Sequence, residues 1–596
     1  MNTSKKRLAA LRKEMKARSI DACVIPATDP HLGEYVPTHW KIVSWLTGFT
    51  GSAATVVVTR SFAGVWTDSR YFIQAGEELS GSGFELVKLK IPHTPEYIEW
   101  LAGSVRKGGT VGFDGRVVSI GLFKQMHKAF GQNRIKIDTG SDLISELWND
   151  RPAMPSSVAF EHPVAYAGLT REVKIGSVRK KMEEMSVDFH LLTSQDDIMW
   201  MLNIRGGDVA YCPLLTCFAI VSADQVLLFV NEEQVPANIM RMFDRSGIVM
   251  LPYDATAGVL SGLPSGNTLL LNPSTVSTGL YMAVSEGVEI IEDVSIPARL
   301  KAIKNSTERS HIRETMIKDG VALTRFFHWL EGTVGRERVT EMSAAARLLE
   351  FRMEQEGCRG ESFATIAAWN EHAALPHYSP SVERDTELGP NGVFLLDSGG
   401  QYTGGTTDVT RCVVFGNPTA RQRMDFTLAL KGTMALARAK FPLGTRGYQI
   451  EVLARKALWE HGLNYGHGTG HGVGFYLNVH EGPQTIGTGA SGDLKTILEP
   501  GMLTADEPAI YRTGEYGFRT ENLILCVEDE LTGFGQFLKF ETVTLCYIDR
   551  RLIEKSLLDM AEIEWIDKYH HRVYELLEPH LDNNMKQWLN QKTAPL

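Results

Sequence analysis

Four acidic residues in the C-terminal half of the sequence are spaced so that two β-hairpins would bring them together in pairs. Asp397 ends one apolar run in VFLLDSGGQYTGGTTDVTRCVVF, and Asp408 begins the next. A hairpin that turns at Tyr402–Thr403 would place the two aspartates opposite each other, with Cβ atoms about 4.5–5.5 Å apart. Two like charges this close destabilise each other, so the pair predicts a cation between them.

A second segment repeats this arrangement. In DEPAIYRTGEYGFRTENLILCV, Glu507 and Glu521 each lie seven residues from Gly514. A hairpin that turns at this glycine would again oppose two carboxylates. A single Asp or Glu is most often a solvated surface group, but two acid pairs within apolar strands of one region indicate a site.

Histidines are concentrated in the same region. The segment NYGHGTGHGVGFYLNVHEGP carries His467, His471 and His480, and His377 lies upstream in AALPHYSP. Glycine lets the backbone approach other groups closely and adopt positive φ, and so many glycines argue against a helix here. Histidines grouped in a Gly-rich loop are typical of a metal or catalytic site.

The charges of these groups predict how many cations they bind. Four carboxylates carry −4 and a neutral imidazole adds nothing, so two divalent cations neutralise the set and leave a bridging water or hydroxide as the reactive species. Oxygen ligands without thiolate favour Mn²⁺ or Co²⁺. Two metals about 3.5–4 Å apart activate water and polarise a carbonyl or phosphoryl oxygen. The chemistry is that of a hydrolase, but these residues alone do not name the bond or choose the ligating histidine.

The elements that must position this site fall into three regions of the 596-residue chain. Residues 1–155 and 156–302 each alternate charged helices with short apolar strands, which predicts two α/β domains with mixed sheets. Their similar order suggests related folds. The region 303–596 opens with two helices, continues with strands and Gly-rich turns, and ends in a helical tail from about residue 549. The expected fold class is α/β and α+β.

Composition excludes several classes of protein. With 61 basic and 71 acidic residues the net charge is −10, which disfavours binding to nucleic acid or to anionic membranes. No apolar run is long enough to span a bilayer, and the basic N-terminus lacks the apolar stretch of a signal peptide. The seven cysteines are scattered without a CxxC motif, which argues against a disulfide scaffold and favours the cytoplasm.

The motifs LLDSGGQYTGGTTDVTR, GHGTGHGVG, NVHEGP and DEP…YGFRTENL resemble those of the M24 metallopeptidases, whose catalytic domain has the pita-bread fold. The resemblance is to the three-domain cytosolic Xaa-Pro aminopeptidase type, and it covers essentially the whole chain. WLTGFTGSA and WTDSRYF look like the first of its two creatinase-like N-terminal domains, and DDIMWMLNIRGGDVAY looks like the second. The tail resembles its C-terminal extension.

The resemblance assigns a role to each candidate residue. The five metal ligands would be Asp397, Asp408, His471, Glu507 and Glu521, with Asp408 and Glu521 bridging two divalent ions, Mn²⁺ first and Co²⁺ or Zn²⁺ as alternatives. Glu507 would also be the general base, and His377 and His480 would contact substrate and stabilise the tetrahedral intermediate. The other substrate-binding residues would be His467, on the proline side of the pocket, Arg519, beside the bridging glutamate, and Tyr511. The family commonly has Gly where this chain has Ala509, which is tolerable only if φ there is negative.

The resemblance also implies an activity and a homodimer. The enzyme would use the bridging hydroxide to remove the first residue from peptides with proline in second place. Three alternatives remain: a prolidase restricted to Xaa-Pro dipeptides, a creatinase-type hydrolase, and a non-catalytic binding protein of the same fold. The three-domain length argues against the first, and the intact ligand set argues against the other two.

Overall fold

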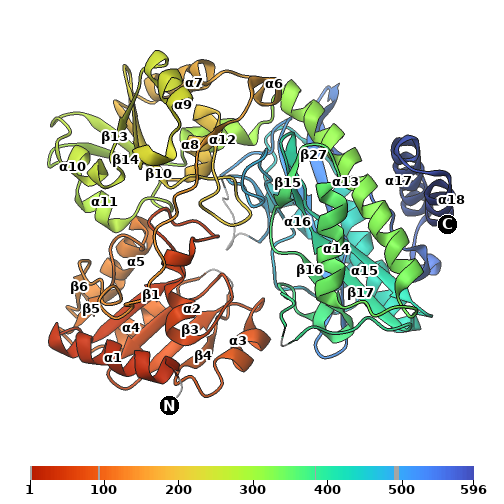
Figure 1. Cartoon of the computed structure of the whole chain (residues 1–596), viewed down its shortest axis with the longest axis horizontal. Helices are drawn as coiled ribbons and strands as arrows, with labels where there is room; N and C mark the ends of the chain where they lie inside the picture. Colours follow the sequence, from red (N-terminus) through yellow and green to blue (C-terminus); the bar gives the residue numbers. More distant parts are fainter. Residues whose placement is uncertain (1–2, 92–93, 383, 489–494) are drawn as a thin grey trace. The chain divides into compact units, whose positions relative to one another are not determined.

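The structure of the protein is a computed structural model that describes residues 3–91, 94–382, 384–488 and 495–596. It contains two compact units, one formed by Met1–Val164 with Leu169–Leu300, and the other by Ala165–Gly168 with Lys301–Leu596 (Figure 1). Each unit is described by itself.

The first unit contains two six-stranded sheets. The first has the strand order β4-β3-β2-β1-β5-β6, with strands β1 (Ala22–Pro26), β2 (Thr55–Thr59), β3 (Ala63–Thr67), β4 (Glu85–Lys88), β5 (Thr110–Gly112) and β6 (Lys136–Asp138). The second has the order β12-β11-β10-β8-β13-β14, with strands β8 (Phe189–Leu192), β10 (Cys217–Ser222), β11 (Val226–Val230), β12 (Ile248–Leu251), β13 (Thr268–Leu271) and β14 (Glu289–Glu292). Helices lie between the strands in both halves (Figure 1).

The two sheets share one topology. In the first, β1 pairs antiparallel with β2 and parallel with β5, and β3 pairs parallel with β4. In the second, β8 pairs antiparallel with β10 and parallel with β13, and β11 pairs parallel with β12. The two mixed α/β sheets expected from the sequence are present, and the suggestion of related folds is confirmed at the level of strand order and direction.

The second unit combines long helices with antiparallel sheets. Its main helices are α13 (Ser306–Thr333), α14 (Glu341–Met353), α15 (Ala420–Ala437), α16 (Gly447–Trp459), α17 (Met560–Leu577) and α18 (Asn583–Lys592). The strands nearest the candidate site are β16 (Ile366–Trp369), β17 (Gly392–Ser398), β20 (Val409–Phe415), β22 (Gly470–His471), β24 (Leu503–Asp506), β25 (Ala509–Arg512), β26 (Tyr516–Arg519) and β27 (Asn522–Thr532). The helical tail expected from about 549 begins as short 3-10 turns before α17.

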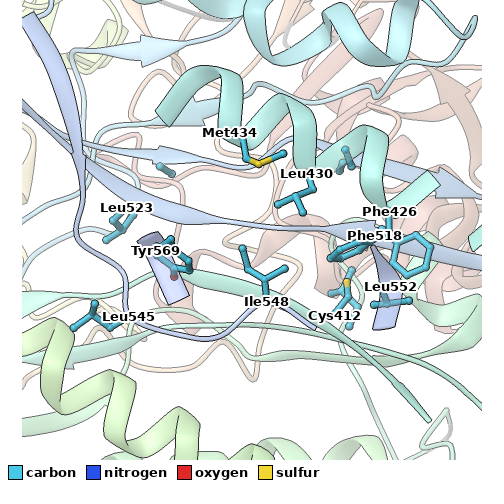
Figure 2. Packing of buried hydrophobic residues seen from close by; sticks show 14 of the residues in the cluster. Cys412, Phe426, Leu430, Met434, Phe518, Leu523, Leu545, Ile548, Leu552 and Tyr569 are labelled. Carbon is cyan, nitrogen blue, oxygen red and sulfur yellow. The ribbon is translucent and has the colours of Figure 1, made fainter. Parts of the chain in front are cut away.

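An apolar layer fixes α15 against the strands of this unit. Phe426, Leu430 and Met434 recur every four residues and therefore lie on one face of the helix. Figure 2 shows this face pointing toward Phe518 of β26 and Leu523 of β27, all of them buried in one cluster. Fully burying such a side chain contributes about 1.5–3 kcal/mol. The layer therefore gives the strands flanking Glu521 a rigid support.

None of the helices among the described residues combines the length and the hydropathy that crossing a bilayer requires.

Candidate metal centre

The first acid-bearing hairpin forms with a register that differs from the predicted one. Asp397 of β17 pairs with Thr410 of β20, not with Asp408, so the prediction of directly opposed aspartates is wrong. The hairpin turns one residue later than expected, at Thr403–Gly404, because Tyr402 pairs with Gly405. Asp408 directly precedes β20, and its carboxylate still meets that of Asp397, because their ligand atoms lie within 4.8 Å of each other.

The second hairpin turns where the sequence predicts. Ala509 of β25 pairs with Arg519 of β26, and Gly514 at the turn has φ +75°, a conformation that glycine adopts without strain. Beyond the acids, Asp506 pairs with Asn522 in the same register. Glu507 lies between β24 and β25 and Glu521 lies between β26 and β27, so the two ladders fix the backbone on both sides of the glutamates.

The Gly-rich segment brings His471 to the acids as strand β22, not as a helix. It packs against β24 so closely that a Cβ on Gly470 would lie 1.8 Å from the carbonyl oxygen of Ala505. The Nδ1 atom of His471 lies 2.9 Å from the carbonyl oxygen of Gly472, which places the proton on Nδ1 and leaves the lone pair of Nε2 for another group. That Nε2 lies 3.5 Å from Oδ2 of Asp408.

Six candidate side chains meet in three overlapping groups, and within each group the ligand atoms lie within 4.8 Å of one another. The groups are Asp397, Asp408 and Glu521; His471, Glu507 and Glu521; and Asp408, His471 and His480. The structure thus gathers all five residues predicted as ligands. It adds His480, whose ring centroid lies 4.3 Å from that of His471.

The electrostatics of the cluster favour cations. Burial, followed by the carboxylates of Glu521 and Asp397, raises the pKa of Asp408 well above its usual value. Burial and the carboxylates of Asp397 and Glu507 raise the pKa of Glu521 in the same direction. Among the described residues, Oδ1 of Asp397 is buried without a hydrogen-bond partner. Because buried like charges are costly unless they are neutralised, this donor set fits two divalent cations.

A chain of hydrogen bonds leads from the acids to three predicted substrate-binding residues. Arg519 donates from Nη2 to Oδ2 of Asp397 and from Nη1 to the hydroxyl of Tyr511, both at 2.6 Å. The Tyr511 hydroxyl lies 2.9 Å from Nε2 of His467. These residues therefore form one network whose end, at Asp397, is part of the acid cluster.

Thr410 is a residue of the site that the sequence reasoning missed. Its hydroxyl donates to Oε2 of Glu521 at 2.7 Å and accepts from Nε of Arg519 at 3.0 Å. The available signal was its place two residues after Asp408 in the strand expected from the sequence, where alternate residues point to the same face. Thr410 orients a carboxylate of the cluster, as groups around metal ligands do.

The remaining two sequence expectations concern His377 and Ala509. His377 lies between β16 and β17, next to Tyr378, whose hydroxyl donates to Glu341 at 2.7 Å. Its predicted contact with substrate stays a prediction. Ala509 lies in the extended strand β25 and is not among the positive-φ residues, so alanine is compatible with the backbone there.

Family models match consecutive parts of the chain. Models of the Creatinase/Prolidase N-terminal domain match residues 7–147 and 150–308. The model of metallopeptidase family M24 matches residues 310–528, and one of the C-terminal region of peptidase M24 matches residues 536–596. The predicted fold class, two N-terminal domains of creatinase type followed by an M24 catalytic domain, is confirmed.

Relatives match over the full length. The chain is 33% identical to aminopeptidase P1 of Lotus japonicus, covering 99% of each chain, and 36% identical to aminopeptidase P2 of Arabidopsis thaliana, covering 97% of this chain and 86% of the relative. Its structure matches the crystal structure of an X-prolyl aminopeptidase from Caenorhabditis elegans, a cytosolic enzyme with a di-nuclear active site, with a TM-score of 0.95, 34% identity and complete coverage of both chains.

Proposed function

The chain belongs to metallopeptidase family M24, as its motifs predict, and we propose that it is an aminopeptidase that hydrolyses the N-terminal Xaa-Pro bond of peptides. The observation that carries this proposal is the convergence of four carboxylates and one imidazole on one cluster, in which Asp397, Asp408 and Glu521 are buried. Relatives that match the whole chain are named aminopeptidase P, which supports the bond specificity.

The residues that would hold two divalent cations are Asp397, Asp408, His471, Glu507 and Glu521, and the carboxylates of Asp408 and Glu521 would serve both ions. Their groups contain only oxygen and imidazole donors, which favours Mn²⁺, with Co²⁺ or Zn²⁺ as alternatives. The preferred tautomer of His471 and the unpaired oxygen of Asp397 support their assignment as ligands.

Different residues of the chain have different roles in catalysis. When bound, two divalent cations supply an activated water and polarise the scissile carbonyl. Glu507 accepts the proton of the attacking water and returns it to the leaving amine. His377 and His480 donate hydrogen bonds to the developing oxyanion, and one good donor of this kind contributes about 3–4 kcal/mol.

Proline in second place requires a dedicated pocket, because the bond before it has no N–H. A site that relies on donation from that N–H loses a contact with such substrates. His467, Tyr511 and Arg519 form the hydrogen-bonded wall that receives the proline side of the substrate. Their network ends on Asp397, which couples the wall to the metal centre.

The decisive experiment compares three peptides with the metal-loaded protein: an Xaa-Pro-Xaa tripeptide, Arg-Pro-Pro, and an Xaa-Pro dipeptide. Metal analysis of the same protein gives the number of ions per chain. Cleavage of the first bond of both tripeptides with two ions bound supports the aminopeptidase. Cleavage of the dipeptide alone identifies a prolidase, and stable metal binding without hydrolysis of any of the three identifies a binding protein.

The variant Asp408→Ala separates catalysis from folding. It removes a proposed bridging ligand, so we expect loss of metal and of Xaa-Pro cleavage with an unchanged circular dichroism spectrum. Near-normal turnover of the tripeptide by this variant would contradict the two-metal proposal.

The remaining proposals concern organisation and location. We propose the three domains 1–155, 156–302 and 303–596, a homodimer, and a cytoplasmic location. All seven cysteines are buried and free, and the C. elegans relative is described as cytosolic; both support the cytoplasmic location.

The homodimer needs a surface that a second copy can cover. The side chains of Tyr448, Val452 and Trp459 are exposed on α16 and offer an apolar surface for it. Light scattering of the purified protein measures the oligomeric state.

A further inference from the structure

Three charged side chains form a buried cluster in the second unit, away from the acid pairs. The ammonium of Lys304 contacts Oε1 of Glu481, and that of Lys301 lies 3.4 Å from Oε2 of the same carboxylate. The exposed fractions of these side chains are 0% for Lys304, 3% for Lys301 and 1% for Glu481. The cluster is therefore sealed from solvent.

Such a cluster is a poor way to stabilise a fold. Removing charges from water costs free energy that their attraction often only offsets, and apolar residues of similar size serve equally well. We therefore examined which part of the chain the carboxylate of Glu481 fixes in position.

Glu481 closes the loop that carries the two neighbouring histidines of the metal centre. Its backbone N–H donates to the carbonyl oxygen of Gly472 at 2.8 Å. His471 precedes Gly472 and His480 precedes Glu481, so this one hydrogen bond joins the two histidines at their bases. A Cβ on Gly472 would lie 2.2 Å from the carbonyl oxygen of Glu481, which shows how tightly the loop closes.

The backbone of Lys304, the residue that pairs with Glu481, is itself held in place. Its backbone N–H donates to the carbonyl oxygen of Gly501 at 2.9 Å. The next residue, Asn305, caps α13 through a capping box with Glu308. Lys304 is therefore held between a β-turn and the start of a 28-residue helix, and it is separated from Glu481 by 177 residues of sequence.

We propose that Glu481, Lys304 and Lys301 are positioning residues that hold His471 and His480 in register with the carboxylates. The cluster anchors the closed end of the histidine loop to the base of α13, and the two rings, 4.3 Å apart, take their orientation from it. This inference rests on the proposed metallopeptidase function, because it concerns the geometry of that centre.

The test compares Lys304→Met with Lys174→Met in the full-length protein. Lys304→Met removes one ammonium but leaves Lys301 to face Glu481, so the chain keeps a counter-charge for the buried carboxylate. Lys174 is a buried lysine of the first unit, whose ammonium donates to Oδ1 of Asn203 at 2.8 Å. It controls for the loss of any buried lysine.

Two quantities are measured: the dissociation constant of Mn²⁺ from the metal-free protein, by competition with a chromogenic chelator, and kcat and KM at saturating metal. Groups that orient ligands typically contribute about 10–100-fold to metal affinity or activity. We expect Lys304→Met to weaken Mn²⁺ binding and to lower kcat by at least tenfold, with KM changed less than kcat. Lys174→Met leaves these values within twofold of wild type.

A triple variant separates positioning from stability. Lys301→Met, Lys304→Met and Glu481→Gln together remove all three charges of this cluster, so we expect a higher melting temperature than for Glu481→Gln alone, which leaves two buried ammonium groups without the carboxylate. We expect metal affinity and kcat to stay low despite that recovery. Wild-type affinity and kcat in Lys304→Met, or their return in the triple variant, would overturn the proposal.

These outcomes are distinct from failure of the proposed function. If the wild-type protein cleaves no Xaa-Pro peptide, the function fails, while the Mn²⁺ affinities still decide whether the cluster positions the histidines. If wild type cleaves the peptide and Lys304→Met equals it in both quantities, the function stands and the positioning role fails.

Discussion

Nε2 of His471 lies 3.5 Å from Oδ2 of Asp408 while its Nδ1 faces the carbonyl oxygen of Gly472. In the neutral ring with its proton on Nδ1, the lone pair of Nε2 faces a carboxylate. A lone pair and a carboxylate oxygen repel each other unless a proton or a cation lies between them. The pair is therefore arranged for an ion, and the behaviour of the protein without metal should reveal this repulsion.

The first prediction is that the metal-free protein loses stability as pH rises. The pKa of Asp408 and that of Glu521 are raised well above their usual values, so the folded state binds protons that the unfolded state has released. Stability from such groups is complete below the unfolded pKa, about 4, and is lost as pH rises through the folded pKa. Thermal unfolding of chelator-treated protein between pH 5 and pH 8 measures it.

Two controls accompany this measurement. Excess Mn²⁺ should remove the decline or reverse it, because metal binding requires deprotonated ligands. Asp408→Asn should flatten the decline in the metal-free protein and abolish the response to Mn²⁺. Metal-free wild type that gains stability over this pH range would contradict the prediction.

The second prediction concerns Glu507 as the general base. Glu507→Gln keeps the shape of the side chain but cannot accept a proton, and a positioned acid or base contributes about 10²–10⁴-fold to the rate. We expect kcat for a tripeptide to fall at least 100-fold at saturating metal. Glu515→Gln, in the turn of the same hairpin, should change kcat less than twofold. A less than tenfold effect of Glu507→Gln would assign the proton transfer to another group.

The third prediction tests the hydroxyl of Thr410. Thr410→Val removes the hydrogen bond to Glu521 at nearly constant volume, and loss of such an orienting bond should weaken metal binding about 10–100-fold. Thr324→Val is the matched control, because Thr324 is a buried threonine of α13 whose hydroxyl donates to the carbonyl oxygen of Gly320. Isothermal titration of the metal-free variants gives the affinities; equal values for both would remove Thr410 from the site.

The fourth prediction tests the wall formed by Tyr511 and His467. Tyr511→Phe deletes the hydroxyl that joins Arg519 to His467, and one hydrogen bond contributes about 1 kcal/mol, or roughly fivefold in binding. We expect KM for Xaa-Pro-Xaa peptides to rise about fivefold while metal content stays constant. Unchanged KM with a lower metal content would place Tyr511 in support of Asp397 instead.

The two acid-bearing hairpins show which features of the site could be predicted from the sequence. Gly514 marks its turn unambiguously, and the register around it is as predicted. The turn between Asp397 and Asp408 contains several Gly and Thr residues, so the sequence does not fix which pair closes it. A shift of one residue in the turn moved the partner of Asp397 from Asp408 to Thr410. In the first hairpin the strands were predictable and their register was not, whereas in the second a single glycine determined both.

Contacts between segments far apart in the sequence could not be predicted either, for a different reason. The pairing of Lys304 with Glu481 has no local signal, because each residue is ordinary in its own segment and the two are 177 residues apart in sequence. The same holds for Arg519 and Asp397, 122 residues apart. The ligand types could be predicted because chemistry restricts them; the residues that orient these ligands could not, because any polar residue at the right place serves.

The last prediction concerns the segment that carries His377. Glu341 is fully buried at the start of α14 and accepts hydrogen bonds from the backbone of Trp369 and from the hydroxyl of Tyr378, both at 2.7 Å. Nδ1 of His372 lies 2.9 Å from the same carboxylate. The hydrogen bond to Glu341 is the main reason that the pKa of His372 is raised above its usual value.

A raised histidine pKa gives stability that is complete below the unfolded pKa, about 6.5, and is lost as pH rises through the folded pKa. The difference in unfolding free energy between wild type and His372→Gln should therefore be larger at pH 5.5 than at pH 8.5, measured by urea denaturation of the metal-loaded protein. His461→Gln is the control, because Nδ1 of His461 lies 3.0 Å from a backbone carbonyl oxygen, that of Ala457. A difference that is the same at both pH values would show that His372 holds the segment through packing, for example through its stacking on the ring of Tyr378.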